Sequence, residues 1–285
     1  MSGSKTSNML VSTEHLREHL ADARWCVVDV RHDLFDTKAG IRAYEQGHIP
    51  GAVFADIDTQ LSGKKTGFNG RHPLPLRDRL VETFRAWGIN DDTQIVGYDA
   101  QGGQFASRLW WLARWLGHEH VALLDGGWPK WLQQTGLSSR QAPEKPRGDF
   151  AASDSLVALA TVRDVLQSLD RCDRMLIDAR TAERYRGEQE PIDAVAGRIP
   201  GAFNRPWQQN LNPDQTFKPA HELRSDFDAL LASRNADQVT HQCGSGVTAC
   251  HNVFAMELAG LPGSALYGGS WSEWIADPSR PVATG

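Results

Sequence analysis

Residues 238–260 read QVTHQCGSGVTACHNVFAMELAG. The first five residues predict a short strand, and residues 248–258 predict a helix that ends before Gly260. A loop of small residues joins the two and begins with Cys243. A strand that leads directly into a helix is typical of α/β domains with parallel sheets, whose sites form at the carboxyl ends of strands. The sequence therefore places the Cys243 sulfur at a helix N-terminus, where backbone N–H groups favour a thiolate and bind anions.

The composition is that of a globular protein. The chain has 285 residues, of which 40% are hydrophobic and 23% charged, so it is long enough for two ordinary domains. The formal net charge of −5 argues against nucleic-acid partners and against binding to an anionic membrane surface. The longest apolar runs are much shorter than a membrane-spanning helix. We therefore expect a protein without a nucleic-acid or membrane partner.

The four cysteines are expected to be reduced thiols. The first ten residues are polar and lack the apolar core of a secretory signal, which predicts a cytoplasmic protein. Cys26 falls in a predicted strand and Cys172 in a charged loop. Neither follows the strand–loop–helix pattern of Cys243, so we expect neither to carry chemistry.

Three blocks of sequence occur twice in the same order. The segments VDVR (28–31) and GHIPGA (47–52) match IDAR (177–180) and GRIPGA (197–202), and LDGGWPKW (124–131) matches LYGGSWSEW (266–274). The copies lie about 150 residues apart, which is too long for a solenoid repeat and indicates a duplicated domain. A polar, proline-containing segment near residues 138–155 is the expected linker. We predict domains at 10–140 and 152–285.

Each half alternates short apolar runs with helical periods. Strands are expected at residues 25–30, 94–98 and 121–124, and again at 175–178, 238–242 and 265–267; a further helix is expected at 104–116. Alignment of the repeats on their last tryptophans puts Ala100 opposite Cys243. The first domain is therefore expected to lack a nucleophile and to be non-catalytic, and the second to carry the catalytic loop.

Together these features resemble the two-domain rhodanese-like sulfurtransferases over roughly residues 10–280. The resemblance implies an α/β fold of two tandem rhodanese-like domains, each a mostly parallel sheet flanked by helices. The loop CGSGVT (243–248) resembles that of the 3-mercaptopyruvate sulfurtransferase branch. The thiosulfate-using branch typically carries two basic residues directly after the cysteine, where this chain has two neutral ones.

The resemblance implies a persulfide mechanism. Cys243 would take the sulfur of 3-mercaptopyruvate, release pyruvate, and pass the outer sulfur to cyanide or to a thiol such as thioredoxin or glutathione. This chemistry requires no metal and no organic cofactor. Substrate contacts are expected from the backbone N–H groups of the loop, which can stabilise charge on sulfur. These loop residues are Gly244, Gly246, Val247 and Thr248.

The resemblance also implies a proton relay. Its members would be Ser245 in the loop, and His72 and Asp58 from the first half of the chain. The donor thiol must lose a proton and the departing pyruvate enolate must gain one. A hydroxyl oriented by an imidazole–carboxylate pair can shuttle that proton.

The carboxylate of the donor needs a cation. Arg184 matches the substrate-binding arginine of the family, and Arg186 is the second choice, because a guanidinium can bind a carboxylate with two hydrogen bonds. The second arginine that the mercaptopyruvate branch usually carries is replaced here by Ile192, and the nearby Arg198 is a candidate substitute.

Several alternatives remain at the level of sequence. A thiosulfate:cyanide sulfurtransferase would use the same loop, and a slow persulfide-carrier protein would load sulfur once without turning over. A tyrosine phosphatase needs Cys-x5-Arg, but Ala249 stands at the arginine position. A zinc site from His241, Cys243, Cys250 and His251 lacks a Cys-x-x-Cys pair, and no Gly-Lys-Ser/Thr motif supports a P-loop.

Overall fold

The computed structural model describes residues 9–171 and 173–285. Cys172, for which no chemistry was expected, lies outside the described residues. The chain divides into two compact units. The first comprises the residues up to Leu61 together with Leu76–Leu156 and Asp214–Thr216, and the second comprises Ser62–Pro75, Val157–Pro213 and Phe217–Gly285. A segment from the first half of the sequence thus belongs to the second unit, which domain limits at 10–140 and 152–285 do not anticipate.

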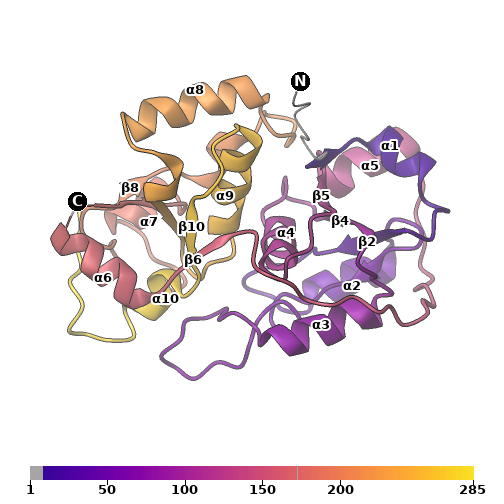
Figure 1. Cartoon of the computed structure of the whole chain (residues 1–285), viewed down its shortest axis with the longest axis horizontal. Helices are drawn as coiled ribbons and strands as arrows, with labels where there is room; N and C mark the ends of the chain where they lie inside the picture. The colour runs from indigo at the N-terminus through magenta and orange to yellow at the C-terminus, as the bar shows by residue number, and fades with distance from the viewer. Residues whose placement is uncertain (1–8, 172) are drawn as a thin grey trace. The chain divides into compact units, whose positions relative to one another are not determined.

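The first unit is a five-stranded parallel sheet in the order β1-β5-β4-β2-β3. In Figure 1, α1 and α5 lie together above these strands, and α2 and α3 lie below them. Its elements are β1 (Leu10–Val11), α1 (Thr13–Glu18), β2 (Trp25–Asp29), α2 (Ala39–Gln46), β3 (Val53–Phe54), α3 (Arg77–Ala86), β4 (Gln94–Tyr98), α4 (Ala106–Trp115), β5 (Val121–Leu124) and α5 (Gly127–Thr135).

The second unit repeats this topology, with the parallel order β6-β10-β9-β7-β8. The α/β prediction, with mostly parallel sheets flanked by helices, is confirmed. Its elements are β6 (Ala158–Ala160), α6 (Val162–Arg171), β7 (Met175–Asp178), α7 (Ala182–Arg186), β8 (Phe203–Asn204), η1 (Trp207–Asn210), α8 (Ala220–Leu231), η2 (Ala236–Gln238), β9 (Val239–Gln242), α9 (Ala249–Leu258), β10 (Ala265–Tyr267) and α10 (Ser270–Trp274).

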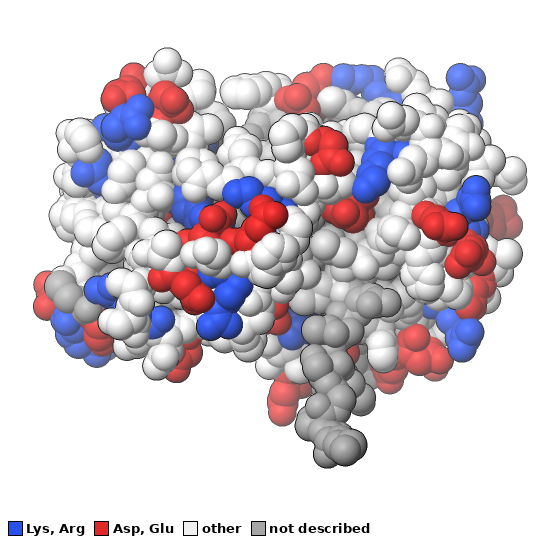
Figure 2. All heavy atoms as spheres, turned by 90° about the horizontal axis from the view of Figure 1, so that it is seen from above, with Lys and Arg blue, Asp and Glu red and all other residues white. Residues whose placement is uncertain are grey.

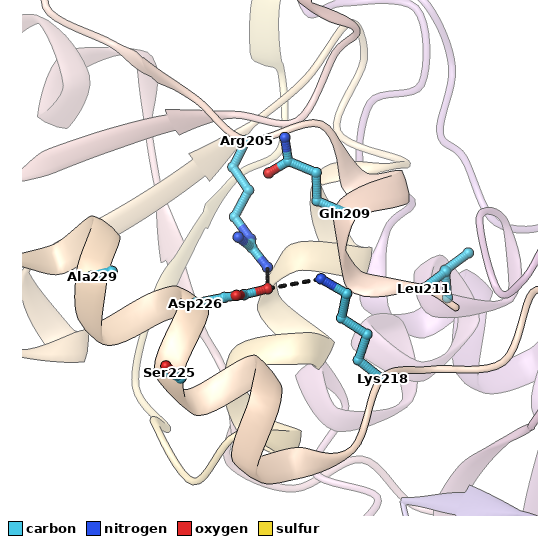
Figure 3. Close-up of a pocket in the computed structure, with 7 residues that line it drawn as sticks. All are labelled: Arg205, Gln209, Leu211, Lys218, Ser225, Asp226 and Ala229. Atoms are coloured by element: carbon cyan, nitrogen blue, oxygen red, sulfur yellow. Dashed lines mark hydrogen bonds and ion pairs between the residues drawn. The ribbon is translucent and has the colours of Figure 1, made fainter. Parts of the chain in front are cut away.

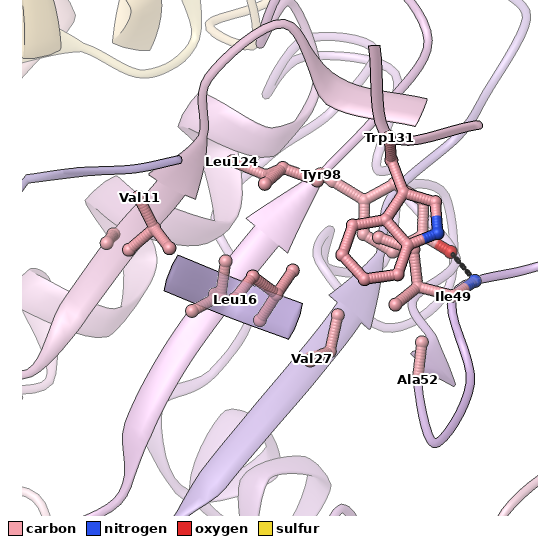
Figure 4. Close-up of a cluster of buried hydrophobic side chains, with 10 residues drawn as sticks. Val11, Leu16, Val27, Ile49, Ala52, Tyr98, Leu124 and Trp131 are labelled. Atoms are coloured by element: carbon pink, nitrogen blue, oxygen red, sulfur yellow. Dashed lines mark hydrogen bonds between the residues drawn. The ribbon is translucent and has the colours of Figure 1, made fainter. Parts of the chain in front are cut away.

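Both faces of each sheet are buried, as expected for parallel strands. In the first unit, one face packs Val27 and Val96 against Leu16 of α1 and Trp131 of α5 (Figure 4). In the second unit, alternate residues of β7 point to opposite faces. Leu176 packs with Trp271 of α10, whereas the residues on either side of it in the strand pack with the apolar face of α8. This period of two fixes the strand register.

The repeated Asp-x-Arg motif joins the end of a strand to a glycine further along the chain within each unit. Arg31 donates to Asp29 (Nη2 to Oδ2, 2.6 Å) and to the carbonyl of Gly47 (2.6 Å). Arg180 makes the equivalent bonds to Asp178 and to the carbonyl of Gly197, both 2.7 Å. Each guanidinium is almost fully buried. A buried charge is tolerated only when it is paired, so we interpret the motif as a structural ion pair in both units.

The strand registers correct the alignment of the two repeats by one residue. Asp29 pairs with Tyr98 across β2 and β4, and Asp178 pairs with Gln242 across β7 and β9. The two aspartates belong to the same repeated motif, so the residue after Tyr98 is the counterpart of the residue after Gln242. The position opposite Cys243 is therefore Asp99 and not Ala100.

Charges of both signs are mixed on the surface. On the face drawn in Figure 2, Lys and Arg side chains are interspersed with Asp and Glu, and the described residues form no extended basic patch there. Among residues 9–171 and 173–285, no helix has the length and apolarity needed to cross a bilayer.

Candidate active site

Cys243 follows β9 directly, at the carboxyl edge of the second sheet, and its side chain is buried. Its amide donates to the hydroxyl of Ser270 (3.1 Å), and its carbonyl accepts from the amide of Trp271 (3.0 Å). The predicted strand and helix on either side are confirmed within one residue, since β9 spans Val239–Gln242 and α9 begins at Ala249. The backbone of Cys243 is therefore fixed by the segment that opens α10.

The loop after Cys243 folds back so that an N–H group meets the sulfur. The amide of Gly246 lies 3.2 Å from Cys243 Sγ. Gly246 has φ +77°, and a Cβ built there would lie 2.1 Å from the carbonyl oxygen of Gly268. Only glycine fits this position, on both backbone and steric grounds. The remaining predicted contact residues, Val247 and Thr248, complete the turn into α9.

The segment Ser62–Pro75 packs against the start of α10, which also holds the backbone of Cys243. The amide of Arg71 donates to the hydroxyl of Ser272 (3.0 Å). Gly70 has φ +84°, and a Cβ there would lie 2.8 Å from the carbonyl oxygen of Gly269. This close approach brings the side chains of Arg71 and His72 to the loop of Cys243 within one compact unit.

Two of the predicted relay residues are hydrogen-bonded. His72 Nδ1 lies 2.7 Å from Ser245 Oγ, and both side chains are buried. Ser245 is two residues from Cys243, so its hydroxyl belongs to the loop that holds the sulfur, and the imidazole contacts it from the segment Ser62–Pro75. Such a pair can accept a proton at one atom and deliver it from another.

Asp58 belongs to the first unit. It follows β3, is partly buried, and its amide donates to Oδ1 of Asp56 at 2.8 Å. Its part in the relay stays a prediction.

Two guanidinium groups lie against Gly244. A Cβ built on this residue would be 2.9 Å from Nη2 of Arg71 and 3.4 Å from Nη2 of Arg184. Arg184 was predicted here, but Arg71 was missed. Its one sequence cue is that it directly precedes His72, and its position depends on the packing of a segment far away in the sequence. Burial lowers the pKa of Arg71, and negative charge at Cys243 opposes that fall.

Two buried carboxylates hold these cations. Asp193 pairs with Arg71, and its other oxygen lies 3.0 Å from Nη2 of Arg184. Glu190 accepts from Arg184 (2.8 Å) and Arg180 (3.3 Å). The sequence did not single out either acid. They form one chain of ion pairs with the buried Asp-x-Arg motif.

The other cation candidates are engaged elsewhere. Arg186 pairs with exposed Glu188 (2.7 Å). Arg198 donates to the carbonyl of Gly285 (2.7 Å) and covers the ring of Tyr185. Of the arginines that the sequence proposed, the structure brings Arg184 to the loop.

The candidates for a zinc site do not converge. Cys250 donates to the carbonyl of Gly246 (3.3 Å), and Nε2 of His241 contacts the sulfur of Met256 (3.1 Å). Burial lowers the pKa of His241 to about 3. Among the residues that the structure describes, Cys243, Cys250, His241 and His251 form no group that could hold a metal ion.

Cys26 is also buried, in β2, where burial raises its pKa to about 11. Its thiol lies 3.6 Å from the carbonyl oxygen of Trp87. This environment disfavours the thiolate and suits a core side chain.

A polar pocket lies elsewhere in the second unit, on α8 and the segment before it (Figure 3). Asp226 in its wall binds Arg205 (3.5 Å) and Lys218 (3.0 Å), so the two cations face an acid of their own. No residue of the Cys243 loop lines this pocket. Its lining residues are Arg205, Gln209, Leu211, Lys218, Ser225, Asp226 and Ala229.

The arrangement around Cys243 combines three chemical functions. The sulfur can act as a nucleophile, the Ser245–His72 pair can move a proton, and the two guanidiniums can bind a carboxylate or another small anion. All of these groups belong to the second unit.

Known proteins are similar to this chain in fold and in sequence. The Rhodanese-like domain model matches residues 12–134 and 161–277. The chain is 45% identical over 283 residues to a Pseudomonas aeruginosa protein named "Probable 3-mercaptopyruvate sulfurtransferase", covering 98% of this chain and 99% of that protein. It is 39% identical over 263 residues to a Mycobacterium tuberculosis protein provisionally named thiosulfate sulfurtransferase SseB, covering 91% and 90%.

A solved structure agrees with these matches. SseA from Escherichia coli, described as a 3-mercaptopyruvate sulfotransferase with the rhodanese fold, superposes with a TM-score of 0.80 at 33% identity. The match covers 92% of this chain and 98% of SseA. Both units of the structure are thus accounted for, and the chain belongs to the rhodanese-like family, with two copies of its domain.

Proposed function

We propose that this protein is a 3-mercaptopyruvate sulfurtransferase that moves sulfane sulfur through a persulfide on Cys243. The observation that carries the proposal is the loop of Cys243, with neutral residues after the cysteine and a hydrogen-bonded Ser245–His72 pair beside it. The 45% identity over nearly the whole length of a relative named for this activity supports the same donor.

In the first half-reaction, the Cys243 thiolate attacks the sulfur of the donor. A sulfur–sulfur bond forms, and the carbon–sulfur bond of the donor breaks with its electron pair on carbon, which leaves pyruvate as its enolate. The thiol proton of the donor leaves sulfur and the enolate gains a proton, so the products are a cysteine persulfide and pyruvate. The N–H of Gly246, which already points at Sγ, is suited to stabilise negative charge on sulfur.

We assign the transfer of the proton from the donor sulfur to the enolate carbon to the relay. Of its members, Ser245 is nearest in sequence to Cys243, and His72 Nδ1 is hydrogen-bonded to Ser245 Oγ. We assign Asp58 to orient His72, as a carboxylate does in comparable triads. Acid–base catalysis by such groups typically contributes about 100- to 10,000-fold in rate.

In the second half-reaction, a thiol or cyanide attacks the outer sulfur and regenerates the Cys243 thiolate. Thioredoxin and glutathione are suitable thiol acceptors, and a reducing compartment such as the cytoplasm suits this chemistry. We assign catalysis to the domain at 152–285 together with the segment that carries His72. The domain at 10–140 has Asp99 at the position of the nucleophile and is assigned a supporting role.

The test is the ratio of kcat/KM for 3-mercaptopyruvate to that for thiosulfate, with cyanide as the common acceptor. We expect the ratio to favour 3-mercaptopyruvate strongly. Ser245→Ala and His72→Gln should each lower kcat with 3-mercaptopyruvate by about 100-fold or more. They should affect thiosulfate less, because sulfite leaves without a carbon that must be protonated. Equal losses with both donors would contradict the relay.

A thiosulfate sulfurtransferase is the second candidate, favoured by one observation. Arg71 and Arg184 offer two cations at Gly244, and a dianion gains from both. A kcat/KM ratio in favour of thiosulfate would establish it. A protein that loads one sulfur from either donor and then stalls would instead be a persulfide carrier.

A further inference from the structure

The pocket on α8 is built around a buried guanidinium (Figure 3). Its volume of about 450 Å³ lies within the range of about 300–1,000 Å³ that is typical of small-molecule sites. Arg205 follows β8 directly, and its side chain is only 6% exposed. Lys218 comes from the segment before α8, and Asp226 comes from α8 itself. The pocket is a second place in this unit, apart from the loop of Cys243.

The guanidinium of Arg205 is bonded mainly to a neutral group. Oδ1 of Asn210 accepts from Nε (3.2 Å) and from Nη2 (2.9 Å). Oδ2 of Asp226 lies 3.5 Å from Nη2, at the limit of a hydrogen bond, and the same oxygen lies 3.0 Å from Nζ of Lys218. Two cations thus share one carboxylate oxygen, and the lysine is the closer of the two. A buried charge is costly unless it is well paired, so this guanidinium is suited to gain a second anion.

The fold itself does not require a cation at this place. The amide of Arg205 donates to the carbonyl of Asp178 (3.0 Å), as the amide of Ala55 donates to the carbonyl of Asp29 (2.8 Å). Ala55 is therefore the counterpart of Arg205, and the first unit has a buried methyl group after the equivalent strand. Unlike the repeated Asp-x-Arg motif, this arginine has no equivalent in the other copy of the domain.

A buried network holds Arg205 in place. Asn210 donates to Oδ1 of Asn252 (2.7 Å), and Asn252 donates in turn to the carbonyl of Arg205 (3.0 Å). Both asparagines are completely buried. The side-chain hydrogen bonds of Arg205 are made by Nε and Nη2, and within residues 9–171 and 173–285 none is made by Nη1. A guanidinium that is already fixed loses little freedom when an anion binds to it.

The remaining lining residues indicate the class of ligand. Gln209 and Ser225 are exposed and carry a side-chain amide and a hydroxyl, and Leu211 and Ala229 supply apolar surface. A guanidinium can bind the two oxygens of a carboxylate with parallel hydrogen bonds, and the apolar surface suits a short hydrocarbon chain. Asp226 repels a second negative charge on the ligand. These features favour a small monocarboxylate over a dianion.

We propose that this pocket is a binding site for a small organic monocarboxylate, with Arg205 and Lys218 as its cations. The carboxylate takes hydrogen bonds from Arg205, and Asp226 keeps its bond to Lys218. Gln209 and Ser225 at the rim offer hydrogen bonds to a polar substituent of the ligand. The site goes beyond the proposed sulfur transfer and does not depend on it, so its test is a measurement of binding.

The first experiment is a titration with propionate, a monocarboxylate with a short apolar chain, followed by amide NMR spectroscopy at constant ionic strength. The signals of Ser225 and Ala229 report the pocket, and those of the Cys243 loop report separate binding there. We expect the pocket signals to shift and saturate with propionate but not with propionamide, which is nearly the same size and neutral. Unchanged signals at Ser225 and Ala229, or an equal response to propionamide, would overturn the proposal.

The second experiment compares variants in the same titration. Lys218→Gln removes a partly exposed cation and leaves Asp226 to Arg205 alone, so the Kd for propionate should rise about tenfold or more. Asp226→Asn removes the competing acid and should lower the Kd about tenfold. Arg205→Ala, which copies the first unit, should abolish binding in the pocket. Should that buried change prevent folding, the opposite shifts expected for the other two variants still decide the matter.

The matched control is Arg224→Gln, which removes an exposed cation from the same helix and should leave the Kd unchanged. Equal Kd values in the wild type, Lys218→Gln and Asp226→Asn would overturn the proposal. A loss in Arg224→Gln as large as that in Lys218→Gln would also overturn it, because propionate would then respond only to the general surface charge.

Titration with sulfate tests the class of ligand. The wild type should bind this dianion more weakly than propionate, and Asp226→Asn should narrow the difference. Tighter binding of sulfate than of propionate by the wild type would overturn the assignment to monocarboxylates.

Discussion

The loop after β4 and the loop after β9 occupy equivalent places in their sheets but surround different groups. In the first unit, the carboxylate of Asp99 accepts four backbone N–H groups of its own loop, at 2.7–3.0 Å, and is completely buried. In the second, the sulfur of Cys243 accepts one, from Gly246. The same turn between strand and helix is therefore an anion cradle in both units. In the first unit a side chain fills it permanently.

A second difference lies one residue further along each loop. Ala100 follows Asp99, whereas Gly244 follows Cys243. A methyl group at Gly244 would lie 2.9 Å from Nη2 of Arg71, too close for an ordinary contact, and 3.4 Å from Nη2 of Arg184. The exchanges of Asp99 for Cys243 and of Ala100 for Gly244 are thus two of the differences between a closed, structural loop and one that offers a sulfur. The duplicated fold supplies the cradle, and its occupant decides the chemistry.

The largest expected effect comes from the sulfur. Cys243→Ser should lower sulfur transfer by more than about 1,000-fold, because serine cannot form a persulfide. Circular dichroism and the melting temperature should stay close to wild type, since the two side chains are similar in size. Cys250→Ala is the matched control, and it should retain transfer. Substantial activity in Cys243→Ser would place the nucleophile elsewhere and break the comparison.

The corresponding change in the first unit should affect stability instead. Asn in place of Asp99 presents an NH2 group to N–H donors, and leaving such donors unsatisfied costs about 2–4 kcal/mol. Urea or thermal unfolding measures this loss, with Asp149→Asn, at an exposed position, as the control. kcat/KM at temperatures well below unfolding should be nearly unchanged. A variant as stable as wild type would mean that the carboxylate does not hold its loop.

The strands before the two loops also differ. His241 pairs with Leu266 as Gly97 pairs with Leu123, so only the second unit has a histidine at this place. Burial, and to a lesser degree Arg205, lowers the pKa of His241 to about 3. The unfolded chain binds this proton more readily, so stability is fully present above about pH 6.5 and is lost as the pH falls from there toward 3.

At pH 5 the contribution of His241 to this loss should be about 2 kcal/mol. The measurement is the free energy of unfolding between pH 7.5 and 5 for the wild type and for His241→Gln. The variant should show a shallower decline. His118→Gln serves as a comparison in the first unit, because burial also lowers the pKa of His118. Parallel curves for wild type and His241→Gln would contradict the expected protonation.

The smallest effect is expected at the glycine. Gly244→Ala gives the second loop the residue of the first. It should raise the KM for 3-mercaptopyruvate about three- to tenfold, because the added methyl displaces the end of Arg71, and it should leave stability nearly unchanged. Ala100→Gly is the reciprocal control and should leave KM unaffected. A normal KM in Gly244→Ala would show that donor binding does not need the close approach of the guanidinium.

Local patterns in the sequence predicted the elements around the site. The strand before Cys243 and the helix after it follow from an apolar run, small residues and a helical period, and β9 and α9 confirm both. The duplication was also visible in the sequence, because the Asp-x-Arg motif occurs in both halves. The motif makes the same hydrogen bonds in each unit, which explains why it is repeated. Such features depend on neighbours in sequence or on a repeated pattern.

The rest depended on contacts between distant segments. Arg71 meets Gly244 because residues 62–75 pack with the second unit, and nothing local in the sequence specifies that. Asp193 and Glu190 read as ordinary acids until their guanidinium partners are known. The pairing of Ala100 with Cys243 was wrong because the two repeats differ in length by one residue between the loop and the following tryptophan. The amide of Trp128 donates to the carbonyl of Asp99, and the amide of Trp271 donates to the carbonyl of Cys243. Alignment on the tryptophans therefore shifts the loops by one position. Sheet register resolves what repeat matching could not.

The most direct test of the account is a single turnover without an acceptor. The protein is mixed with 3-mercaptopyruvate, pyruvate is quantified, and every cysteine-containing peptide is weighed by mass spectrometry. We predict close to one pyruvate per chain and one added sulfur atom on the peptide of Cys243, with none on the peptides of the other cysteines. Pyruvate release without sulfur on Cys243, or sulfur on another cysteine, would contradict the claim that the cradle after β9 holds the reacting sulfur.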